Sequence, residues 1–330
     1  MTADFGALGV AVGHATDSEG ATGLTVIRGV DGPLRAGAAV FGRATGTREL
    51  HTLTVNHLVD RIDAVMLTGG SAYGLDAAAG VMRWMEERGR GFAVPGGVVP
   101  IVPAAVIFDL VPLGRFDARP TAPMAYEACD IASPNDIGEG SIGAGTGATV
   151  GKIAGPTRAM KGGLGCAIES NAGWRVAAIA VVNAFGDVRD SSGRIIAGAR
   201  ADESAAPQFI DAARQLATSP ALAQSRLGAR LGAAATNTTL ALVATDAPLG
   251  RLELTQLAWA AGAALFRRIT PTGTTVDGDI VFAVGPAVSA APLGNATMAL
   301  EALAVAALEG AIERAVRTAR GRDGVPGLAD

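Results

Sequence analysis

Short apolar segments typical of β-strands alternate with alanine-rich segments of helical periodicity along the whole chain. The pattern predicts strands at 25–27, 38–41, 63–67, 106–110, 166–169, 175–183, 239–244 and 280–284. It predicts helices at 75–88, 123–131, 205–218, 252–269 and 296–320. Neither a Pro/Ser linker nor a run of charge divides the sequence. We therefore expect residues 1–330 to form one α/β domain in which sheets and helices are layered.

Glycine marks the ends of several of these elements. Gly69 and Gly70 follow a buried strand, and Gly89 is placed to stop the helix before it. Residues 170–173 join two strands in a predicted hairpin. Between residues 138 and 165 glycine is so frequent that a packed helix is excluded, and the backbone there can take positive φ and approach a ligand closely.

The composition limits the class of protein. Hydrophobic residues make up 49% and charged residues 18%, which is enough apolar material to bury a core. The net charge of −4, without a basic tail, argues against nucleic acid as the main partner. Cys129 and Cys166 form no disulfide framework and no metal-binding pair. With no signal-peptide pattern at 1–10, and with prolines interrupting the apolar stretch 98–110, we expect a cytoplasmic protein that does not span a membrane.

The two lysines of the chain, Lys152 and Lys161, both lie in the glycine-rich segment, whereas the whole chain has 25 arginines. An alanine, glycine and arginine bias of this kind is typical of a GC-rich genome, which accounts for the scarcity of lysine. It does not account for the position of Lys152. A compact ammonium group with an adjustable pKa does what a guanidinium group cannot, so both interpretations stay open.

Familiar catalytic motifs do not fit. A phosphate-binding loop needs four residues between its glycine and Gly-Lys, but five separate Gly145 from Gly151, and Ile153 stands where the motif has a hydroxyl. A dinucleotide-binding loop lacks a clean preceding strand. Ser71 lacks the second glycine of a serine-hydrolase elbow, and no histidine follows His57. The histidines are interpreted as ordinary surface or core residues, and no cofactor or metal is expected.

An enzyme of this composition can still use a threonine hydroxyl, with the threonine's own α-amine as the base. The arrangement requires cleavage of the chain before that threonine. Segment 235–248 fits, because small residues lead to Asn237-Thr238 and a β-rich run begins at once. The same pattern also fits an ordinary strand after a polar turn, so the residues alone leave both interpretations open.

Segment 235–248 resembles the autocleavage site of the L-aminopeptidase/D-esterase (DmpA-type) family of N-terminal-nucleophile hydrolases. The resemblance extends over nearly the whole chain, through motifs at 9–14, 21–26, 67–75, 98–109, 161–165, 180–183 and 277–279. Each motif is weak alone, and their order and spacing make the resemblance specific. It implies an αββα layered sandwich and cleavage of the Asn237–Thr238 bond into chains 1–237 and 238–330.

The resemblance also implies site residues. The nucleophile is Thr238, and the other implied catalytic residues are Tyr73, Lys152, Asn183, Asp277 and Asp279. Asn183 and Tyr73 are the candidates for binding the oxyanion or the substrate carbonyl. The charged residues of the implied site act on the Thr238 amine in opposite directions. Lys152 would lower the pKa of this amine, whereas the two aspartates would raise it.

The aspartate pair and the Asn-Thr-Thr sequence bring the chain closer to the nylon-oligomer-hydrolase branch than to the aminopeptidase branch. The aminopeptidase branch has a serine nucleophile and a hydroxyl-x-Glu pair. The implied substrates are small peptide-like amides, namely amino-acid amides, β-peptides or aminohexanoate oligomers. Two alternatives remain: an acyltransferase of the ornithine-acetyltransferase type, and a scaffold without turnover. The resemblance further implies self-association to a tetramer or larger.

Overall fold

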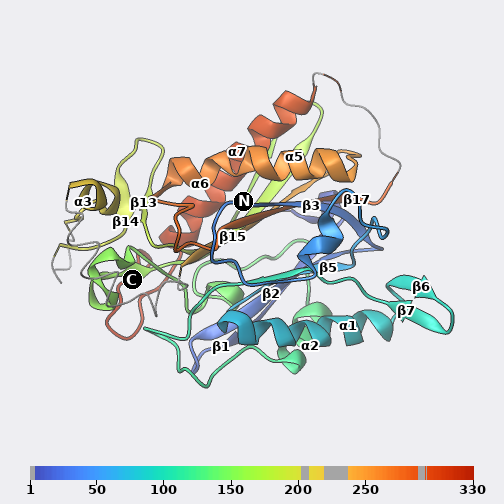
Figure 1. The fold of residues 1–330 in the computed structure, drawn as a ribbon, viewed down its shortest axis with the longest axis horizontal. Helices are drawn as coiled ribbons and strands as arrows, with labels where there is room; N and C mark the ends of the chain where they lie inside the picture. The colour runs from blue at the N-terminus through green and yellow to red at the C-terminus, as the bar shows by residue number, and fades with distance from the viewer. Residues whose placement is uncertain (1–3, 202–207, 219–236, 289–293, 295) are drawn as a thin grey trace.

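The computed structural model describes residues 4–201, 208–218, 237–288, 294 and 296–330. Two five-stranded sheets lie face to face (Figure 1). The strands of the first, in spatial order, are β1 (Val10–Asp17), β2 (Thr22–Gly29), β5 (Ala64–Thr68), β8 (Ala104–Val106) and β4 (Thr47–Arg48). Those of the second are β11 (Gly163–Ser170), β12 (Arg175–Asn183), β15 (Thr238–Thr245), β17 (Ile280–Pro286) and β3 (Leu34–Val40).

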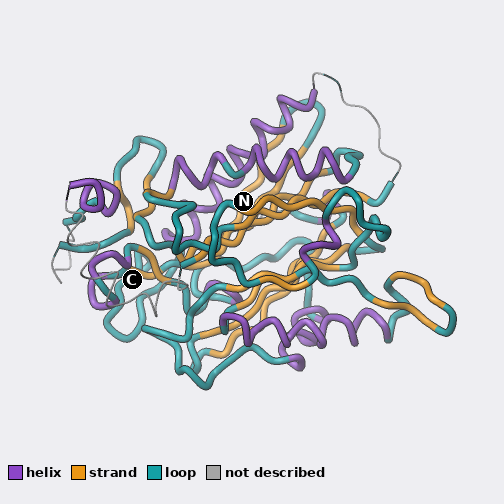
Figure 2. The backbone as a smooth tube through the Cα atoms, viewed as in Figure 1, coloured by secondary structure: helices purple, strands orange, loops and turns teal. Residues whose placement is uncertain are grey.

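Helices cover the outer faces of both sheets (Figure 2). The first sheet carries α1 (Ala78–Glu86) and α2 (Ala122–Asp130). The second carries α5 (Arg251–Ala261), α6 (Ala263–Arg268) and α7 (Ala296–Arg317), of which α7 packs on β11 and β12 and α5 on β3 and β17. The αββα sandwich expected from the resemblance is confirmed.

The two faces of one strand contribute to two different apolar layers. In β12, Ile179 and Val181 belong to the cluster between the two sheets. Val176, Ala178 and Val182 belong to the cluster under the helices of the second sheet. A strand buried on both faces has no polar face to alternate with, so it reads as a continuous apolar run.

Smaller elements complete the described part of the chain. The remaining strands are β6 (Phe92–Val94), β7 (Gly97–Val99), β9 (Thr149–Val150), β10 (Met160–Lys161), β13 (Asp187–Arg189), β14 (Ile195–Ala197) and β16 (Ile269–Thr270). The short helices are η1 (Gly6–Leu8), η2 (Leu50–Leu53), η3 (Ser71–Ala77), η4 (Gly143–Gly145), η5 (Lys152–Ala154), η6 (Pro156–Arg158) and α3 (Ala212–Thr218). As expected, the glycine-rich segment contains no packed α-helix; it forms the short helices η4, η5 and η6 and the strands β9 and β10.

Several predicted boundaries hold. β12 has the predicted bounds, and Ser170 pairs with Arg175 at the end of the predicted hairpin. Gly89 has a φ of 64° just after α1, as a helix stop requires. The predicted helix 205–218 has the correct end but a wrong start, because α3 begins at Ala212 and residues 208–211 are not helical. Residues 202–207 lie outside the described part of the chain.

Two predicted elements differ from the structure. The helix predicted at 252–269 divides into α5 and α6 at Gly262, where the ring of Phe41 packs so closely that a Cβ would lie 2.0 Å from it. The strand predicted at 106–110 ends at Val106. Asp109 instead turns its carboxylate toward Thr22 Oγ1 and the amide of Gly70, each 2.7 Å away. No helix within the described residues is long and apolar enough to cross a membrane.

Candidate active site

Thr238 is the first residue of β15, in the middle of the second sheet. Its partner on the adjacent antiparallel strand is Asn183, the last residue of β12. On the other side β17 runs parallel to β15 (Figure 1). The end of β12 and the beginning of β15 therefore meet where the two central strands terminate, and Thr238 is 3% exposed there.

The carbonyl oxygen of the peptide bond between Asn237 and Thr238 accepts two hydrogen bonds. Thr238 Oγ1 donates a hydrogen bond to the carbonyl oxygen of Asn237, at 2.6 Å. The amide of Gly278 donates to the same oxygen, at 2.8 Å. Asn237 also forms a parallel bridge with Asp277. The hydroxyl and the carbonyl that would react in self-cleavage are thus neighbours in a buried position.

Lys152 and Asn183 form a hydrogen-bonded pair beside Thr238. Lys152 Nζ donates to Asn183 Oδ1 at 2.7 Å and to the backbone oxygen of Asn183 at 3.0 Å. The amide of Thr149 also donates to Oδ1, and Asn183 Nδ2 donates to the carbonyl of Phe108, both at 3.1 Å. Two donors on one side and an acceptor on the other fix the orientation of the side-chain amide.

The ammonium group of Lys152 lies in a site that favours its neutral form. Burial lowers the pKa of Lys152 to about 7, against the opposing charges of Asp277, Asp109 and Asp279. At neutral pH a large fraction of this lysine is unprotonated. A neutral amine of this kind can accept a proton.

The two aspartates after the α6 region lie against the start of β15. Asp279 Oδ1 accepts the amide of Thr239 at 2.6 Å, and its Oδ2 accepts Thr272 Oγ1 and the amide of Gly273. Asp277 Oδ2 accepts the amide and the hydroxyl of Thr274. Burial raises the pKa of both carboxyl groups, that of Asp277 to about 6, where the charge of Asp279 adds to the effect.

Comparisons with known proteins identify the family. The model of peptidase family S58 matches residues 7–328. The chain belongs to peptidase family S58. It is 41% identical over 280 residues to an uncharacterized aminopeptidase of Mycobacterium bovis, which covers 82% of this chain and 75% of the relative. It is 32% identical over 287 residues to a 6-aminohexanoate-oligomer endohydrolase of a Kocuria species, covering 84% and 72%.

Solved structures show the same fold. The L-aminopeptidase D-Ala-esterase/amidase of Ochrobactrum anthropi superposes with a TM-score of 0.73 at 20% identity, over 100% of this chain and 92% of that one. A β-aminopeptidase of a Burkholderia species gives a TM-score of 0.69 at 20% identity, over 100% and 90%. The family and its relatives make this S58 member a hydrolase that acts on amide or peptide bonds.

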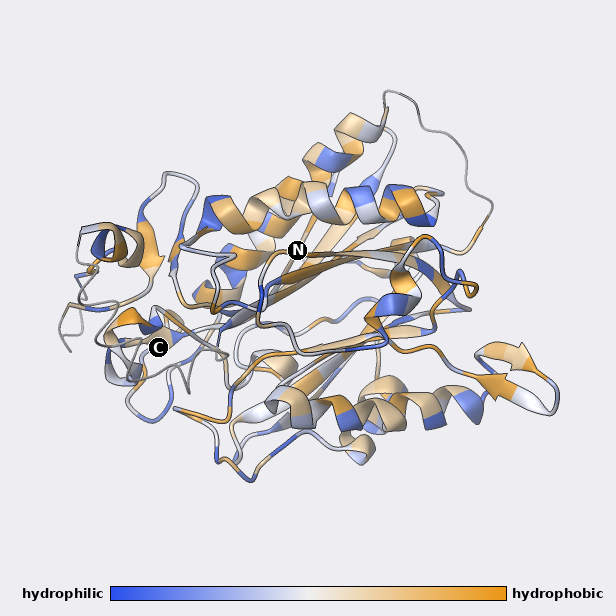
Figure 3. Cartoon of the chain, viewed as in Figure 1, coloured by the Kyte–Doolittle hydropathy of each residue, from blue (hydrophilic) through white to orange (hydrophobic). Residues whose placement is uncertain are grey.

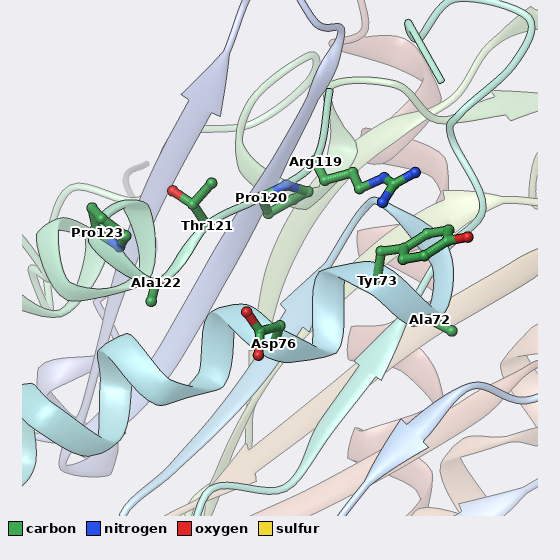
Figure 4. A pocket seen from close by; sticks show the side chains of 8 residues that line it. All are labelled: Ala72, Tyr73, Asp76, Arg119, Pro120, Thr121, Ala122 and Pro123. Atoms are coloured by element: carbon green, nitrogen blue, oxygen red, sulfur yellow. The ribbon is translucent and has the colours of Figure 1, made fainter. Parts of the chain in front are cut away.

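Tyr73 of this S58 hydrolase lies in a different setting from the other implied residues. It follows β5 on η3, and its side chain is 52% exposed. The Arg119 guanidinium carbon lies 3.5 Å from the centre of its ring. Both residues line a pocket of about 680 Å³ together with Asp76 (Figure 4). The contact seen for Tyr73 is with Arg119, and its role toward Thr238 stays a prediction.

Sequence reasoning assigned no role to Lys161, although it had singled out both lysines. Lys161 is 1% exposed, and its Nζ donates to four carbonyl oxygens, those of Gly145, Thr146, Ala148 and Gly162. Burial lowers the pKa of Lys161 to about 7, against the opposing charge of Asp109. Lys161 thereby holds the turn just before Thr149, whose amide donates to Asn183 Oδ1. The signal in the sequence was a second lysine among glycines, in a chain that otherwise uses arginine.

Proposed function

We propose that this S58 hydrolase folds as a single domain, cleaves its own Asn237–Thr238 bond, and then hydrolyses small amides with Thr238 as an N-terminal nucleophile. The observation that carries the proposal is the position of Thr238 Oγ1, 2.6 Å from the carbonyl oxygen of Asn237 in a buried peptide. The hydroxyl already lies against the bond that it would attack. The products are residues 1–237 and 238–330.

Self-cleavage begins when Thr238 Oγ1 attacks the carbonyl carbon of Asn237 and gives up its proton. No free α-amine exists before cleavage, so another base must take that proton. Lys152 is the proposed base, because its pKa of about 7 leaves it partly neutral and its partner Asn183 pairs with Thr238 across the strands. The C–N bond then breaks, the nitrogen of Thr238 takes a proton and an ester remains. Water hydrolyses the ester to the Asn237 carboxylate and the free hydroxyl.

Turnover repeats the chemistry on a substrate. The new α-amine of Thr238, with an ordinary pKa of about 7.7–8.0, takes the hydroxyl proton while Oγ1 attacks the substrate carbonyl. The amine passes the proton to the leaving nitrogen, and water then hydrolyses the acyl-enzyme. Asn183 Nδ2 and the Tyr73 hydroxyl are the proposed donors to the oxyanion. Donors of this kind contribute a few kcal/mol each, on the order of 10²–10³ in rate.

Asp277 and Asp279 have separate proposed roles. Asp279 accepts the amide of Thr239 and thereby holds the beginning of β15, so it positions the nucleophile. Asp277 interacts electrostatically with Lys152 and lies beside Asn237. We propose that it holds the α-amine of Thr238 or an amino group of the substrate.

Intact mass spectrometry tests the cleavage. The wild type is expected to give fragments 1–237 and 238–330. Thr238→Ala is expected to stay whole, and Thr238→Ser, which keeps a hydroxyl at the same position, is expected to cut. A wild type that stays uncut and still hydrolyses amides contradicts the mechanism.

Substrate class needs a separate assay. The proposed substrates are amino-acid amides, β-peptides and aminohexanoate oligomers, and the cut protein is expected to hydrolyse at least one of these groups. Acyl transfer to added ornithine without hydrolysis would support the acyltransferase alternative. Complete self-cleavage without turnover on the panel would support a scaffold.

We also propose that the protein assembles with itself, as a tetramer or larger. The hairpin β6–β7 extends from the edge of the molecule and carries hydrophobic residues (Figure 3). Phe92 and Val99 are 45% and 43% exposed there, and an isolated two-stranded hairpin is marginally stable in water. The apolar face of α7 is already packed inside the chain, on β11 and β12. Light scattering is expected to give a multimer for the wild type and a smaller species for Phe92→Ser.

The proposed compartment is the cytoplasm. Both cysteines, Cys129 and Cys166, are free and buried. Unpaired thiols fit a reducing compartment. Fractionation of cells that express the untagged protein tests this assignment.

A further inference from the structure

The carbonyl oxygen of Asn237 has two hydrogen-bond donors in the uncut chain. One is Thr238 Oγ1, at 2.6 Å, and the other is the backbone amide of Gly278, at 2.8 Å. When Oγ1 attacks, its proton leaves and the oxygen bonds to the carbonyl carbon, so the first donor is lost. The Gly278 amide is the donor of this pair that persists as charge develops on the Asn237 oxygen.

Gly278 lies directly against the nucleophile. A Cβ at this position would lie 2.7 Å from Thr238 Oγ1 and 2.7 Å from the carbonyl oxygen of Ala44. The φ of Gly278 is not in the left-handed region, so backbone conformation does not require glycine here. The close approach of Thr238 Oγ1 does require it. This accounts for the glycine between the two aspartates.

The peptide that carries this amide is held on both sides. The carbonyl of Asp277 accepts the amide of Ala44, and the carbonyl of Asp279 accepts the amides of Phe41 and Gly42. Downstream, Asp279 also bonds to Thr239 through its carboxylate. A donor fixed before the reaction needs no reorganisation when charge appears, which is how an oxyanion site works.

We propose that the backbone amide of Gly278 is the oxyanion donor of the self-cleavage step. As Thr238 Oγ1 bonds to the carbonyl carbon of Asn237, the C=O electron pair moves to oxygen and is stabilised by the Gly278 N–H. The pair returns when the C–N bond breaks and the nitrogen of Thr238 takes a proton. The inference rests on the proposed cleavage at Asn237–Thr238 and adds the group that stabilises its intermediate.

Replacing the Gly278 nitrogen by oxygen tests this without adding a side chain. Glycolic acid is incorporated at position 278 of the full chain by cell-free translation, which turns the amide into an ester. Self-cleavage is followed by intact mass. The rate is expected to fall on the order of 10²–10³-fold, as for the loss of one oxyanion donor.

Gly42 offers a matched control. Its amide donates to the carbonyl of Asp279, at 3.2 Å, in the same clamp but not to Asn237. Glycolic acid at position 42 is expected to leave cleavage within a few-fold of the wild-type rate. Equal rates for the two esters, whether fast or slow, overturn the proposal, because the effect then does not depend on the Asn237 oxygen.

A second measurement does not depend on the ester chain folding. In uncut Thr238→Ala, nuclear magnetic resonance should detect scalar coupling across the hydrogen bond between the Gly278 nitrogen and the Asn237 carbonyl carbon. Absence of that coupling overturns the proposal. Failure of the proposed function has a different signature, because the wild type itself then stays uncut at Asn237–Thr238.

Discussion

Lys152 Nζ lies 2.7 Å from Asn183 Oδ1 and 3.0 Å from the backbone oxygen of the same residue. This pair joins the glycine-rich segment to the end of β12, next to the head of β15. It also fixes the orientation of the Asn183 side-chain amide, because Oδ1 accepts from Lys152 and Nδ2 donates to the carbonyl of Phe108. This lysine therefore bears on both the proposed proton transfer and the orientation of a proposed oxyanion donor.

Lys152 predicts a pH profile for self-cleavage. Only the neutral amine accepts a proton, and burial lowers the pKa of Lys152 to about 7, so the rate should rise between pH 6 and 8 and then level off. Lys152→Arg keeps the charge at all these pH values and should slow cleavage roughly 10²-fold or more, without the rise. Intact mass against time at each pH measures this. Near-normal cleavage by Lys152→Arg would contradict a role of this lysine in proton transfer and leave codon usage as the explanation of its presence.

Lys161 predicts a stability effect. Lys161→Met leaves four buried carbonyl groups without their donor, and the free energy of unfolding should fall by about 3 kcal/mol. Denaturant unfolding in the uncut Thr238→Ala background measures it. The control is Arg115→Met, which removes an exposed ion pair with Asp117 and should change stability by less than about 0.5 kcal/mol. A Lys161→Met effect no larger than the control contradicts this role.

The same lysine predicts how stability depends on pH. The pKa of Lys161 is about 7 in the folded chain, below its ordinary value of about 10.4. Between these values the unfolded chain binds the proton and the folded chain does not, so the free energy of unfolding rises with pH from 7 to 10. It falls again as the pH drops from 10 to 7, and below pH 7 this group causes no further change because both states hold the proton. Lys161→Met should reduce this slope, measured by denaturant unfolding of Thr238→Ala at several pH values. An unchanged slope would place the titration elsewhere.

Tyr73 predicts a separation between processing and turnover. Tyr73→Phe keeps the ring under Arg119 and removes the hydroxyl, so kcat for amide hydrolysis should fall roughly 10²-fold while self-cleavage continues. Arg119→Met is the control, because it removes the guanidinium and keeps the hydroxyl. Wild-type kcat in Tyr73→Phe would leave Tyr73 with a packing role at the pocket.

Asp279 predicts loss of cleavage through the position of β15. Its carboxylate accepts three donors, and Asp279→Asn turns one oxygen into an N–H group that faces a donor. We expect slower cleavage and a free energy of unfolding lower by about 2 kcal/mol. Asp246→Asn, which keeps its acceptor for Arg175 at the far end of β15, is the control. Normal cleavage in a destabilised Asp279→Asn variant would show that Asp279 supports the fold without positioning the nucleophile.

Apolar pattern was a sufficient guide for most of the fold. Segment 175–183 is predicted and observed with the same bounds, because a strand buried on both faces appears in the sequence as one continuous apolar run. The break between α5 and α6 was not predictable, because the ring of Phe41, from another part of the chain, packs on Gly262. Local periodicity carries no information about such a contact.

The motifs identified Lys152, Asn183, Asp277 and Asp279 as candidates, and the fold groups them with Thr238 around the beginning of β15. Their catalytic roles stay predictions. Lys161 shows the limit of sequence reasoning, because its four acceptors are backbone carbonyls, which every residue has. Nothing in the sequence marks which carbonyls will face a buried lysine.

The sequence by itself determined the alternation of strands and helices, the likeness to a peptidase family, and the threonine at the head of a buried strand. Only the tertiary structure decided that the amide of Gly278 meets the carbonyl of Asn237. Backbone donors are chemically alike along the chain. The parallel register of β15 and β17 selects the one that faces the bond proposed to be cleaved.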